Sequence, residues 1–277
     1  MAQTTTKPRG RPAAAAGPSQ QPAARGLDNA LALLEVIAGA DGVTLSEAAQ
    51  RAGVAASTAH RILTTLEAHR FLRVDAERDV WMIGVRAFEV GNAFLRDRKV
   101  TEIGRPHMIA LMETTGETVN VSIREGDALI YVGQIETHNP VRAFQRPGSR
   151  APLHASAAGK VFLAFQSEPS LDDTLYRTGL EGITAGTITS AAELKAQLKT
   201  VREQRFAADL EERVAGLACV AAPVFNEHHD VIASLSVSGP TSRMTGERVL
   251  ELGPLVRRAA EDVTETVGGR LPVRRAA

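Results

Sequence analysis

The 277-residue sequence carries 32 Lys and Arg residues against 32 Asp and Glu residues, and this even charge excludes a globally basic protein that coats nucleic acid. The length is nearly twice the ~150 residues of one typical domain, and a hydrophobic fraction of 44% excludes wholesale disorder, so we expect two modest domains or one large one. No apolar run approaches the ~18 residues of a membrane span and the N-terminus lacks the apolar core of a signal peptide, so we expect a soluble, cytoplasmic protein.

The first 25 residues differ from the rest of the chain in composition and charge. They contain Lys7, Arg9, Arg11 and Arg25 but no acidic residue, and they have no large apolar residue after Met1. We therefore predict a disordered basic arm over residues 1–25. Within it, Pro8-Arg9-Gly10-Arg11-Pro12 resembles the core of an AT-hook, in which Arg side chains enter a narrow A·T-rich minor groove. A solubilising tail without a partner is the alternative.

Three short helices are predicted next. An apolar stripe from Leu27 to Ile37 predicts the first. Thr44 and Glu47 have the spacing of a capping box, which predicts a second helix that ends at Gly53. Ser57 is predicted to cap the third. Its inward face has the spacing of a buried stripe, with Ala59, Ile62, Leu63 and Leu66.

Beyond Arg70 the apolar period changes to two. Residues 71–74 predict a strand, residues 75–79 a polar turn and residues 80–83 a return strand. Three helices followed by a β-hairpin form the order of a winged helix-turn-helix, which we predict over residues 26–84.

The third helix is the element expected to read DNA, because a helix-turn-helix places the N-terminal residues of its second helix at base edges in the major groove. Arg61 can bind a guanine edge through two hydrogen bonds, and hydroxyl groups can reach phosphates or bases. An ordinary solvated helix face is the alternative, but the helix spacing, the short turn and the hairpin together favour DNA. With the two arginines of the arm, the expected contacts are Ser57, Thr58, His60, Arg61, Thr64, Thr65, Arg9 and Arg11.

The remaining chain predicts a larger α+β domain. Two helices are expected over residues 85–95 and 101–115, the second beginning near Pro106 or kinked there. Further helices are expected over residues 157–165, 191–204 and 246–267. Strands are expected over residues 118–123, 129–135, 141–144, 217–225 and 231–238. Hairpins without a regular βαβ repeat predict one antiparallel sheet with helices packed on it.

Eight motifs, in chain order, resemble the IclR family of bacterial transcriptional regulators. They are Arg25-Gly26-Leu27 and the segments 55–63, 81–84, 115–120, 154–160, 209–212, 216–224 and 236–240. The resemblance covers about residues 25–270 and is nearest to the glyoxylate-bypass (acetate operon) repressor branch. Two positions depart from the family pattern. Ala55-Ala56 replaces a Pro followed by a polar residue, and Arg70 stands where a glycine usually precedes the wing.

The resemblance implies an architecture and an assembly. The winged helix-turn-helix would be followed by a linker and dimerisation helix over residues 85–100 and a GAF-like effector-binding domain over residues 101–270. Homodimers would assemble into a homotetramer on palindromic double-stranded operator DNA. No cofactor, metal or membrane partner is implied.

Residues 156–159 suggest an anion site. Ser156 is placed to cap the next helix, which would leave the N–H groups of Ala157, Ala158 and Gly159 as donors for a carboxylate. Tight packing of these small residues against the sheet is an equal alternative. Ser234, Ser236 and Ser238 alternate along one strand, a pattern that by itself usually marks a water-facing sheet side.

The resemblance points instead to an effector pocket. It implies that Ala157, Ala158, Asp209, Cys219, Ser236 and Ser238 contact a small 2-oxoacid. Hydroxyl and amide groups would hold the carboxylate, and Asp209 would face the carbonyl or its hydrate. The small side chains favour glyoxylate or pyruvate over an aromatic acid.

Cys219, the one cysteine of the chain, allows other interpretations. As a nucleophile it needs a base, for which His154 is the candidate, and as a redox sensor it needs an exposed thiolate of low pKa. A buried pocket wall fits its mid-strand position better. The preferred hypothesis is therefore a ligand-responsive regulator, a repressor or dual regulator of glyoxylate or acetate-type carbon metabolism. The alternative is a cytoplasmic enzyme acting on an oxoacid through Cys219 and His154, with the winged helix as an oligomerisation module.

Overall fold

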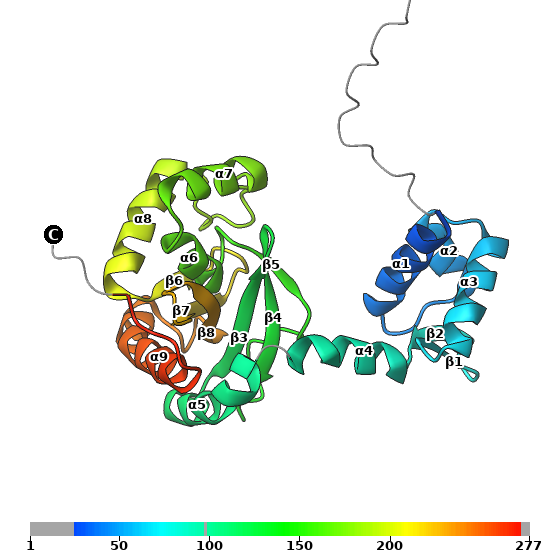
Figure 1. The fold of residues 1–277 in the computed structure, drawn as a ribbon, viewed down its shortest axis with the longest axis horizontal. Coiled ribbons are helices and arrows are strands. Elements are labelled where there is room, and N and C mark those ends of the chain that lie inside the picture. The colour runs from blue at the N-terminus through cyan, green and yellow to red at the C-terminus, as the bar shows by residue number, and fades with distance from the viewer. Residues whose placement is uncertain (1–24, 97–98, 273–277) are drawn as a thin grey trace, which may run out of the picture. The chain divides into compact units, whose positions relative to one another are not determined.

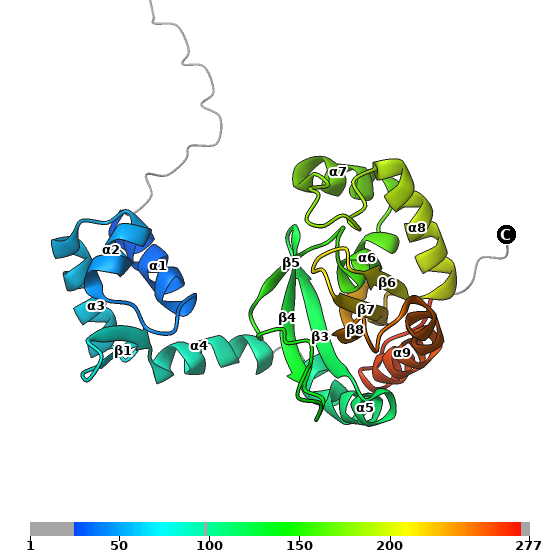
Figure 2. The ribbon, with the colours of Figure 1, turned by 180° about the vertical axis from the view of Figure 1, so that it is seen from behind.

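The computed structural model describes residues 25–96 and 99–272 and divides into two compact units (Figures 1 and 2). The division falls between Ala93 and Phe94, within the predicted linker helix. Apart from Arg25, the predicted basic arm lies outside the described residues. None of the described helices is both long and apolar enough to cross a membrane.

The N-terminal unit has the predicted order of three helices and a hairpin. It contains α1 (Arg25–Ala38), α2 (Leu45–Ala52), α3 (Ala56–Ala68), β1 (Leu72–Asp75) and β2 (Val80–Ile83). Its core is apolar and draws on all three helices and β1, with Leu33, Ile37, Ala48, Leu63 and Leu72 fully or almost fully buried. The predicted capping box is confirmed, since Thr44 and Glu47 each cap the other's backbone, and Gly53 ends α2 with φ 65°.

The start of α3 differs from the prediction. Ala55 is its N-cap, and no side chain caps this end. Ser57 was predicted to cap α3, which is wrong because the helix begins one residue before it and leaves its hydroxyl within the first turn. The inward face is as predicted, with Ala59 and Leu63 buried and Ile62 and Leu66 packed against the same core.

Arg70 adopts a left-handed backbone conformation, with φ 61°, before the wing. The turn is closed by the Arg70 N–H, which donates to the Glu67 carbonyl at 2.7 Å, and by the Phe71 N–H, which donates to the Leu66 carbonyl at 2.8 Å. A glycine adopts this conformation without a steric penalty, whereas arginine adopts it at a cost of about 1 kcal/mol. The turn that the family resemblance leads one to expect with glycine is therefore formed here with a larger side chain.

Helix α4 (Val85–Arg96) follows the wing, and α5 (Lys99–Thr115) precedes the large sheet. Helix α5 begins seven residues before Pro106, close to the predicted residue 101, so of the two alternatives for Pro106 a start near that residue is wrong, and Pro106 lies inside the helix. The start of the helix is set by apolar packing, since Val100 is already part of the core shared with the sheet. Gly116 ends α5 with φ 73°.

The second unit is built on one six-stranded antiparallel sheet in the order β5-β4-β3-β8-β7-β6. The strands are β3 (Thr118–Glu125), β4 (Ala128–Ile135), β5 (Arg150–Pro152), β6 (Ala207–Leu210), β7 (Leu217–Phe225) and β8 (Val231–Pro240). The predicted antiparallel sheet is confirmed, but the strand predicted over residues 141–144 is wrong. That segment is irregular, with Val141 and Phe144 exposed, and the carbonyl of Val141 accepts from the Arg243 guanidinium instead of a neighbouring strand.

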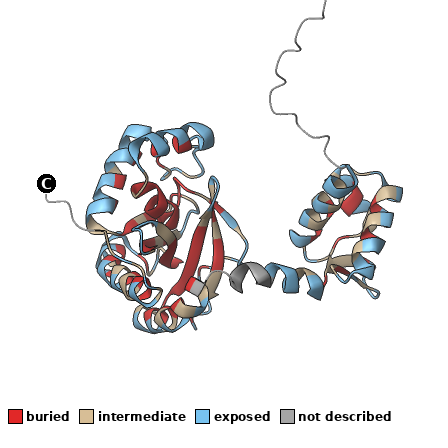
Figure 3. Cartoon of the chain, in the orientation of Figure 1, coloured by how far each residue is buried: buried red, intermediate tan, exposed pale blue. Residues whose placement is uncertain are grey.

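Helices cover both faces of this sheet (Figure 1). Helices α5 and α9 (Gly246–Thr266) pack on one face, and α6 (Ala157–Ala164), α7 (Glu168–Thr178) and α8 (Ala191–Gln204) belong to the other side. The central strands β3, β7 and β8 are mostly buried between the two helical layers (Figure 3). Ser234, Ser236 and Ser238 are consequently buried and face away from the α5–α9 core, not toward water.

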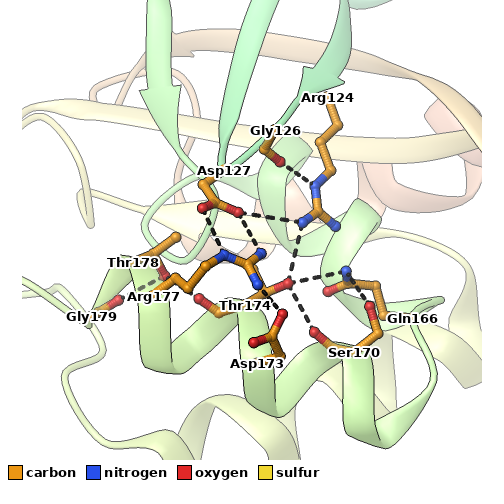
Figure 4. A network of polar contacts seen from close by, with 10 residues as sticks. All are labelled: Arg124, Gly126, Asp127, Gln166, Ser170, Asp173, Thr174, Arg177, Thr178 and Gly179. Atoms are coloured by element: carbon orange, nitrogen blue, oxygen red, sulfur yellow. Dashed lines mark hydrogen bonds and ion pairs between the residues drawn. The ribbon is translucent and has the colours of Figure 1, made fainter. Parts of the chain in front are cut away.

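Helix α7, which the apolar pattern did not predict, is held to the turn between β3 and β4 by polar contacts (Figure 4). Arg177 donates to both carboxylate oxygens of Asp127, at 3.0 and 2.8 Å. Arg124 donates to the Thr174 hydroxyl at 3.2 Å and to the Gly126 carbonyl at 2.7 Å. Because much of this attachment is made by charged side chains, hydrophobic periodicity gives little signal for the helix.

Candidate functional site

Helix α3 presents a polar face to solvent. Ser57, His60, Arg61, Thr64 and Thr65 are exposed, and Thr58 is half-buried. The Thr65 hydroxyl donates to the Arg61 carbonyl at 2.8 Å, so it is engaged within the helix. The side chains expected to read DNA therefore lie together on one surface, opposite the buried Ala59 and Leu63. Arg9 and Arg11 lie outside the described residues.

The second unit contains a small, partly open cavity at one end of β7 and β8. Its lining residues come from four strands, two loops and the start of α6: Tyr131, Gln145, Ser156, Asp209, Arg213, Val214, Leu217, Ala218, Cys219 and Ser238. The sheet register explains how Asp209, Cys219 and Ser238 meet, because Cys219 is paired with Asp209 on β6 and with Ser238 on β8. The empty space is about 20 Å³.

Three of the six residues expected to contact an effector line this cavity, and three do not. Asp209, Cys219 and Ser238 are in its wall, whereas Ala157, Ala158 and Ser236 are buried and do not line it. Ser156 caps α6 as predicted, but its hydroxyl accepts from the Gly159 N–H at 3.2 Å. That N–H is therefore not a free donor, contrary to the expectation.

The start of α6 is packed closely. A Cβ atom on Gly159 would lie 2.3 Å from the Leu153 carbonyl oxygen, so only glycine fits between the helix and this segment. Ala157 and Ala158 are 0% and 1% exposed. Close packing of small residues thus describes their surroundings in this structure.

Burial sets the protonation chemistry of the cavity. It raises the pKa of Asp209 to about 6, with a further raising effect from Glu212, while a hydrogen bond from the Glu212 N–H opposes the shift. Burial also raises the pKa of the Cys219 thiol to about 11 and that of the Tyr131 phenol to about 12. The thiol and the phenol are therefore protonated at neutral pH, and the cavity combines a titratable carboxyl group with neutral donors.

A buried ion pair lies behind Asp209. The Lys160 ammonium group is 0% exposed and donates to Glu212 at 2.5 Å, to the Ala208 carbonyl at 2.7 Å and to Gln197 at 2.8 Å. Because Lys160 is on α6 and Glu212 follows β6, the pair ties the helix to the segment that carries Asp209. With its three acceptors, this lysine has a structural role in the core.

Sequence reasoning missed three polar residues of the cavity wall, Tyr131, Gln145 and Arg213. Arg213 donates to the Tyr131 hydroxyl at 2.8 Å and to the Gln145 side-chain carbonyl at 2.6 Å. Gln145 and Arg213 lie in loops, where no periodicity marks a side chain as inward-facing. Tyr131 lies two residues after Leu129 on the same inward face of β4, and a tyrosine at an inward position was the one signal available.

The alternative of a Cys219–His154 catalytic pair is not supported by the geometry. His154 is buried, with its Nε2 atom 3.0 Å from the Glu181 carbonyl oxygen. The Cys219 sulfur instead accepts from the Ser238 hydroxyl at 3.2 Å. A protonated thiol whose hydrogen-bond donor is a serine lacks the activating base that nucleophilic catalysis requires.

Two family models match the chain. The model "IclR helix-turn-helix domain" matches residues 26–76, and the model "Bacterial transcriptional regulator IclR C-terminal" matches residues 92–265. Together they cover the helix-turn-helix of the N-terminal unit and most of the second.

Two bacterial regulators match nearly the whole chain in sequence. The HTH-type transcriptional regulator BhcR of Paracoccus denitrificans is 42% identical over 258 residues, which cover 93% of this chain and 92% of the relative. The acetate operon repressor of Salmonella typhimurium is 40% identical over 264 residues, which cover 94% and 96%.

The fold is also that of a solved regulator. The crystal structure of the Thermotoga maritima IclR superposes with a TM-score of 0.75 at 28% identity and covers 88% of this chain and 99% of that one. The chain therefore belongs to the IclR family of bacterial transcriptional regulators, which bind DNA through a helix-turn-helix and carry an effector-binding domain in place of an enzyme active site.

Proposed function

We propose that this protein is a cytoplasmic repressor or dual regulator of glyoxylate or acetate-type carbon metabolism that binds palindromic operator DNA and responds to glyoxylate or pyruvate. The observation that carries the proposal is the small cavity in which Asp209, Cys219 and Ser238 meet. Its small size and the few polar groups placed in its wall suit a small polar acid better than an aromatic one. The 40% identity to a protein named acetate operon repressor supports the metabolic assignment.

The proposal assigns a separate function to each of three segments. Residues 26–84 bind DNA, residues 85–100 link and dimerise, and residues 101–270 bind the effector. The exposed apolar side chains of Val85, Phe88 and Val90 on α4 support a dimer contact there, since burying them against a partner removes apolar surface from water. Dimers then pair into a homotetramer on the two halves of the operator.

The effector acts by binding the DNA-competent and DNA-incompetent states with different affinities. The buried hydroxyl groups of Ser122 and Ser234, on the sheet side away from the α5–α9 core, have no hydrogen-bond partner within the described residues. These hydroxyl groups are unused donors and acceptors near Ser236, Ala157 and Ala158, the residues that are proposed to contact the effector. A ligand that reaches these residues requires the small cavity to enlarge.

The test of this proposal begins with operator selection from random duplexes, followed by fluorescence anisotropy with the selected DNA. Addition of glyoxylate or pyruvate should change the operator affinity, and acetamide should not. Arg61→Ala should weaken specific binding by about 5- to 150-fold, because one bidentate base contact contributes about 1–3 kcal/mol. Arg248→Ala, an exposed arginine on α9, is the matched control and should leave binding unchanged. Absence of sequence-specific binding in every condition would sink the proposal.

The basic arm is proposed to add minor-groove contacts through Arg9 and Arg11. Replacing both by alanine should weaken operator binding and reduce the slope of log affinity against log salt by about two, because each neutralised phosphate contributes about 0.9. Lys7→Ala, which lies outside the Pro8–Pro12 segment, should reduce the slope by at most about half as much. An unchanged slope in the double variant would assign the arm a solubilising role.

A further inference from the structure

Arg213 is a half-buried cation at the cavity that forms no close ion pair with a carboxylate of the described residues, although its charge acts on Asp209. Both hydrogen-bond acceptors of its guanidinium group, the Tyr131 hydroxyl and the Gln145 carbonyl, are neutral, and its Cζ atom lies 5.6 Å from the centre of the Tyr131 ring. Within the described residues no carboxylate forms an ion pair with it. Partly buried guanidinium groups are usually paired with carboxylates or phosphates, so this one has the chemistry of an anion-binding group.

The cavity cannot admit even a small acid as it stands. About 20 Å³ of space holds a single water molecule. Cys219, Ser238 and Asp209 are fixed in the sheet by backbone ladders, and Ser156 is fixed as the cap of α6. Arg213 lies in the turn between β6 and β7 and is held over the cavity by side-chain contacts. It can rotate without breaking the sheet.

The charge of the cavity also requires a cation. Asp209 lies in the same wall, and its carboxylate form repels an incoming anion. Lys160, the other nearby cation, is fully enclosed and already neutralised by Glu212. Arg213 is the one cation among the residues that line the cavity.

We infer that Arg213 is the specificity-determining residue for the effector: its guanidinium leaves Tyr131 and Gln145 and takes the carboxylate of the 2-oxoacid, which opens the cavity and selects an anion over a neutral isostere. The inference rests on the proposed function, because it concerns the same ligand in the same cavity. Tyr131 and Gln145 then compete with the ligand for one guanidinium group. Removing a competitor and removing the guanidinium should have opposite effects.

Isothermal titration calorimetry on the full chain tests this exchange with pyruvate and its neutral isostere pyruvamide. The wild type should prefer pyruvate by about tenfold or more, since charge-assisted hydrogen bonds are roughly twice as strong as neutral ones. Arg213→Gln should weaken pyruvate binding by about 10- to 100-fold and change pyruvamide binding by less than about threefold. Tyr131→Phe should bind pyruvate several times more tightly.

Two further variants separate binding from folding. Arg213→Lys keeps the charge but loses the planar pair of donors, so it should retain the preference for pyruvate at reduced affinity. Arg142→Gln removes an exposed arginine of the loop that carries Gln145, where it pairs with Glu136 at 2.7 Å, and should change neither ligand's affinity.

The outcomes distinguish the inference from the function on which it rests. If the wild type binds neither pyruvate nor glyoxylate, the proposed effector class fails and the role of Arg213 fails with it. If the wild type binds pyruvate and Arg213→Gln binds it equally well, the inference alone is overturned. Equal losses of pyruvate and pyruvamide binding in Arg213→Gln would give Arg213 a structural role only, which also overturns it.

Discussion

Asp209 is a buried carboxyl group whose pKa is raised by its surroundings. It is 7% exposed, and Glu212, Lys160 and Arg213 are the charged groups that act on its pKa. Glu212 raises this pKa, while the two cations lower it by less than burial raises it. Lys160 has three acceptors at hydrogen-bond distance, whereas Asp209 accepts one backbone hydrogen bond, from the Glu212 N–H, and otherwise faces a cavity. The ionised form of Asp209 is therefore kept at a cost in stability.

Replacing Asp209 with Asn should stabilise the fold at neutral pH. The folded pKa of about 6 lies above the ordinary value of 3.8, so the unfolded chain loses this proton first and stability falls as pH rises between these values. Above pH 6 the cost is constant at about 2–3 kcal/mol. Urea denaturation should therefore show Asp209→Asn more stable than the wild type by up to that amount at pH 7.5, with little difference near pH 4.

A matched substitution controls for general charge effects. Asp172→Asn removes an exposed carboxylate on α7 that pairs with Lys195, and it should change the free energy of unfolding by less than about 1 kcal/mol. An equal gain for Asp209→Asn at both pH values would contradict the assigned burial cost.

At the scale of elements, the helix starts differ in how they are capped. Hydroxyl side chains cap α2, α6, α8 and α9, at Thr44, Ser156, Ser190 and Thr245. Helix α3, whose N-cap residue is Ala55, has no such cap. It consequently lacks a local stabilising contact and depends on packing of Ala59 and Leu63 against α1 and α2.

Ala55→Ser should supply the missing cap and stabilise the N-terminal unit by about 0.5–1.5 kcal/mol. Ser57→Ala should change its stability by less than about 0.5 kcal/mol, because Ser57 lies within the first turn and caps nothing. Chemical denaturation followed by the fluorescence of Trp81, the one tryptophan of the chain, reports this unit. A larger loss in Ser57→Ala than the gain in Ala55→Ser would show that the helix begins later than described.

For the whole molecule, the two compact units predict two unfolding transitions. Each has its own apolar core, and the division lies within one helix, α4. Trp81 fluorescence follows the first unit, while far-ultraviolet circular dichroism follows both. Excess pyruvate should raise the midpoint of the transition seen only by circular dichroism, because a ligand stabilises the unit that binds it. It should leave the midpoint of the fluorescence transition unchanged.

The control stabilises the first unit in place of the second. Ala55→Ser should raise the midpoint of the fluorescence transition and leave the second transition where it is. A single transition, shifted equally for both probes by pyruvate, would mean that the units unfold as one cooperative body.

The sequence by itself determined most of the elements, because their signals are local. The capping box of α2, the apolar stripe of α3 and the alternation in β7 and β8 each require only neighbouring residues. The local signals failed where contacts are distant or polar. Helix α7 buries only Leu171 and Leu175 as apolar residues and is otherwise attached by charged and polar side chains. Strand β5 is short, and the Val141 carbonyl accepts from Arg243, far along the chain.

Only the tertiary structure decided which residues line the cavity. The alternation of Ser234, Ser236 and Ser238 is the same whether one face of the sheet meets water or a helix, and the covering by α6 makes that face an interior. The pairing of β6 with β7 and β7 with β8 brings Asp209, Cys219 and Ser238 together, whereas Arg213 reaches the same place from a loop. Periodicity encodes which face a residue occupies; the meeting of distant side chains depends on strand order and loop conformation, which no local pattern specifies.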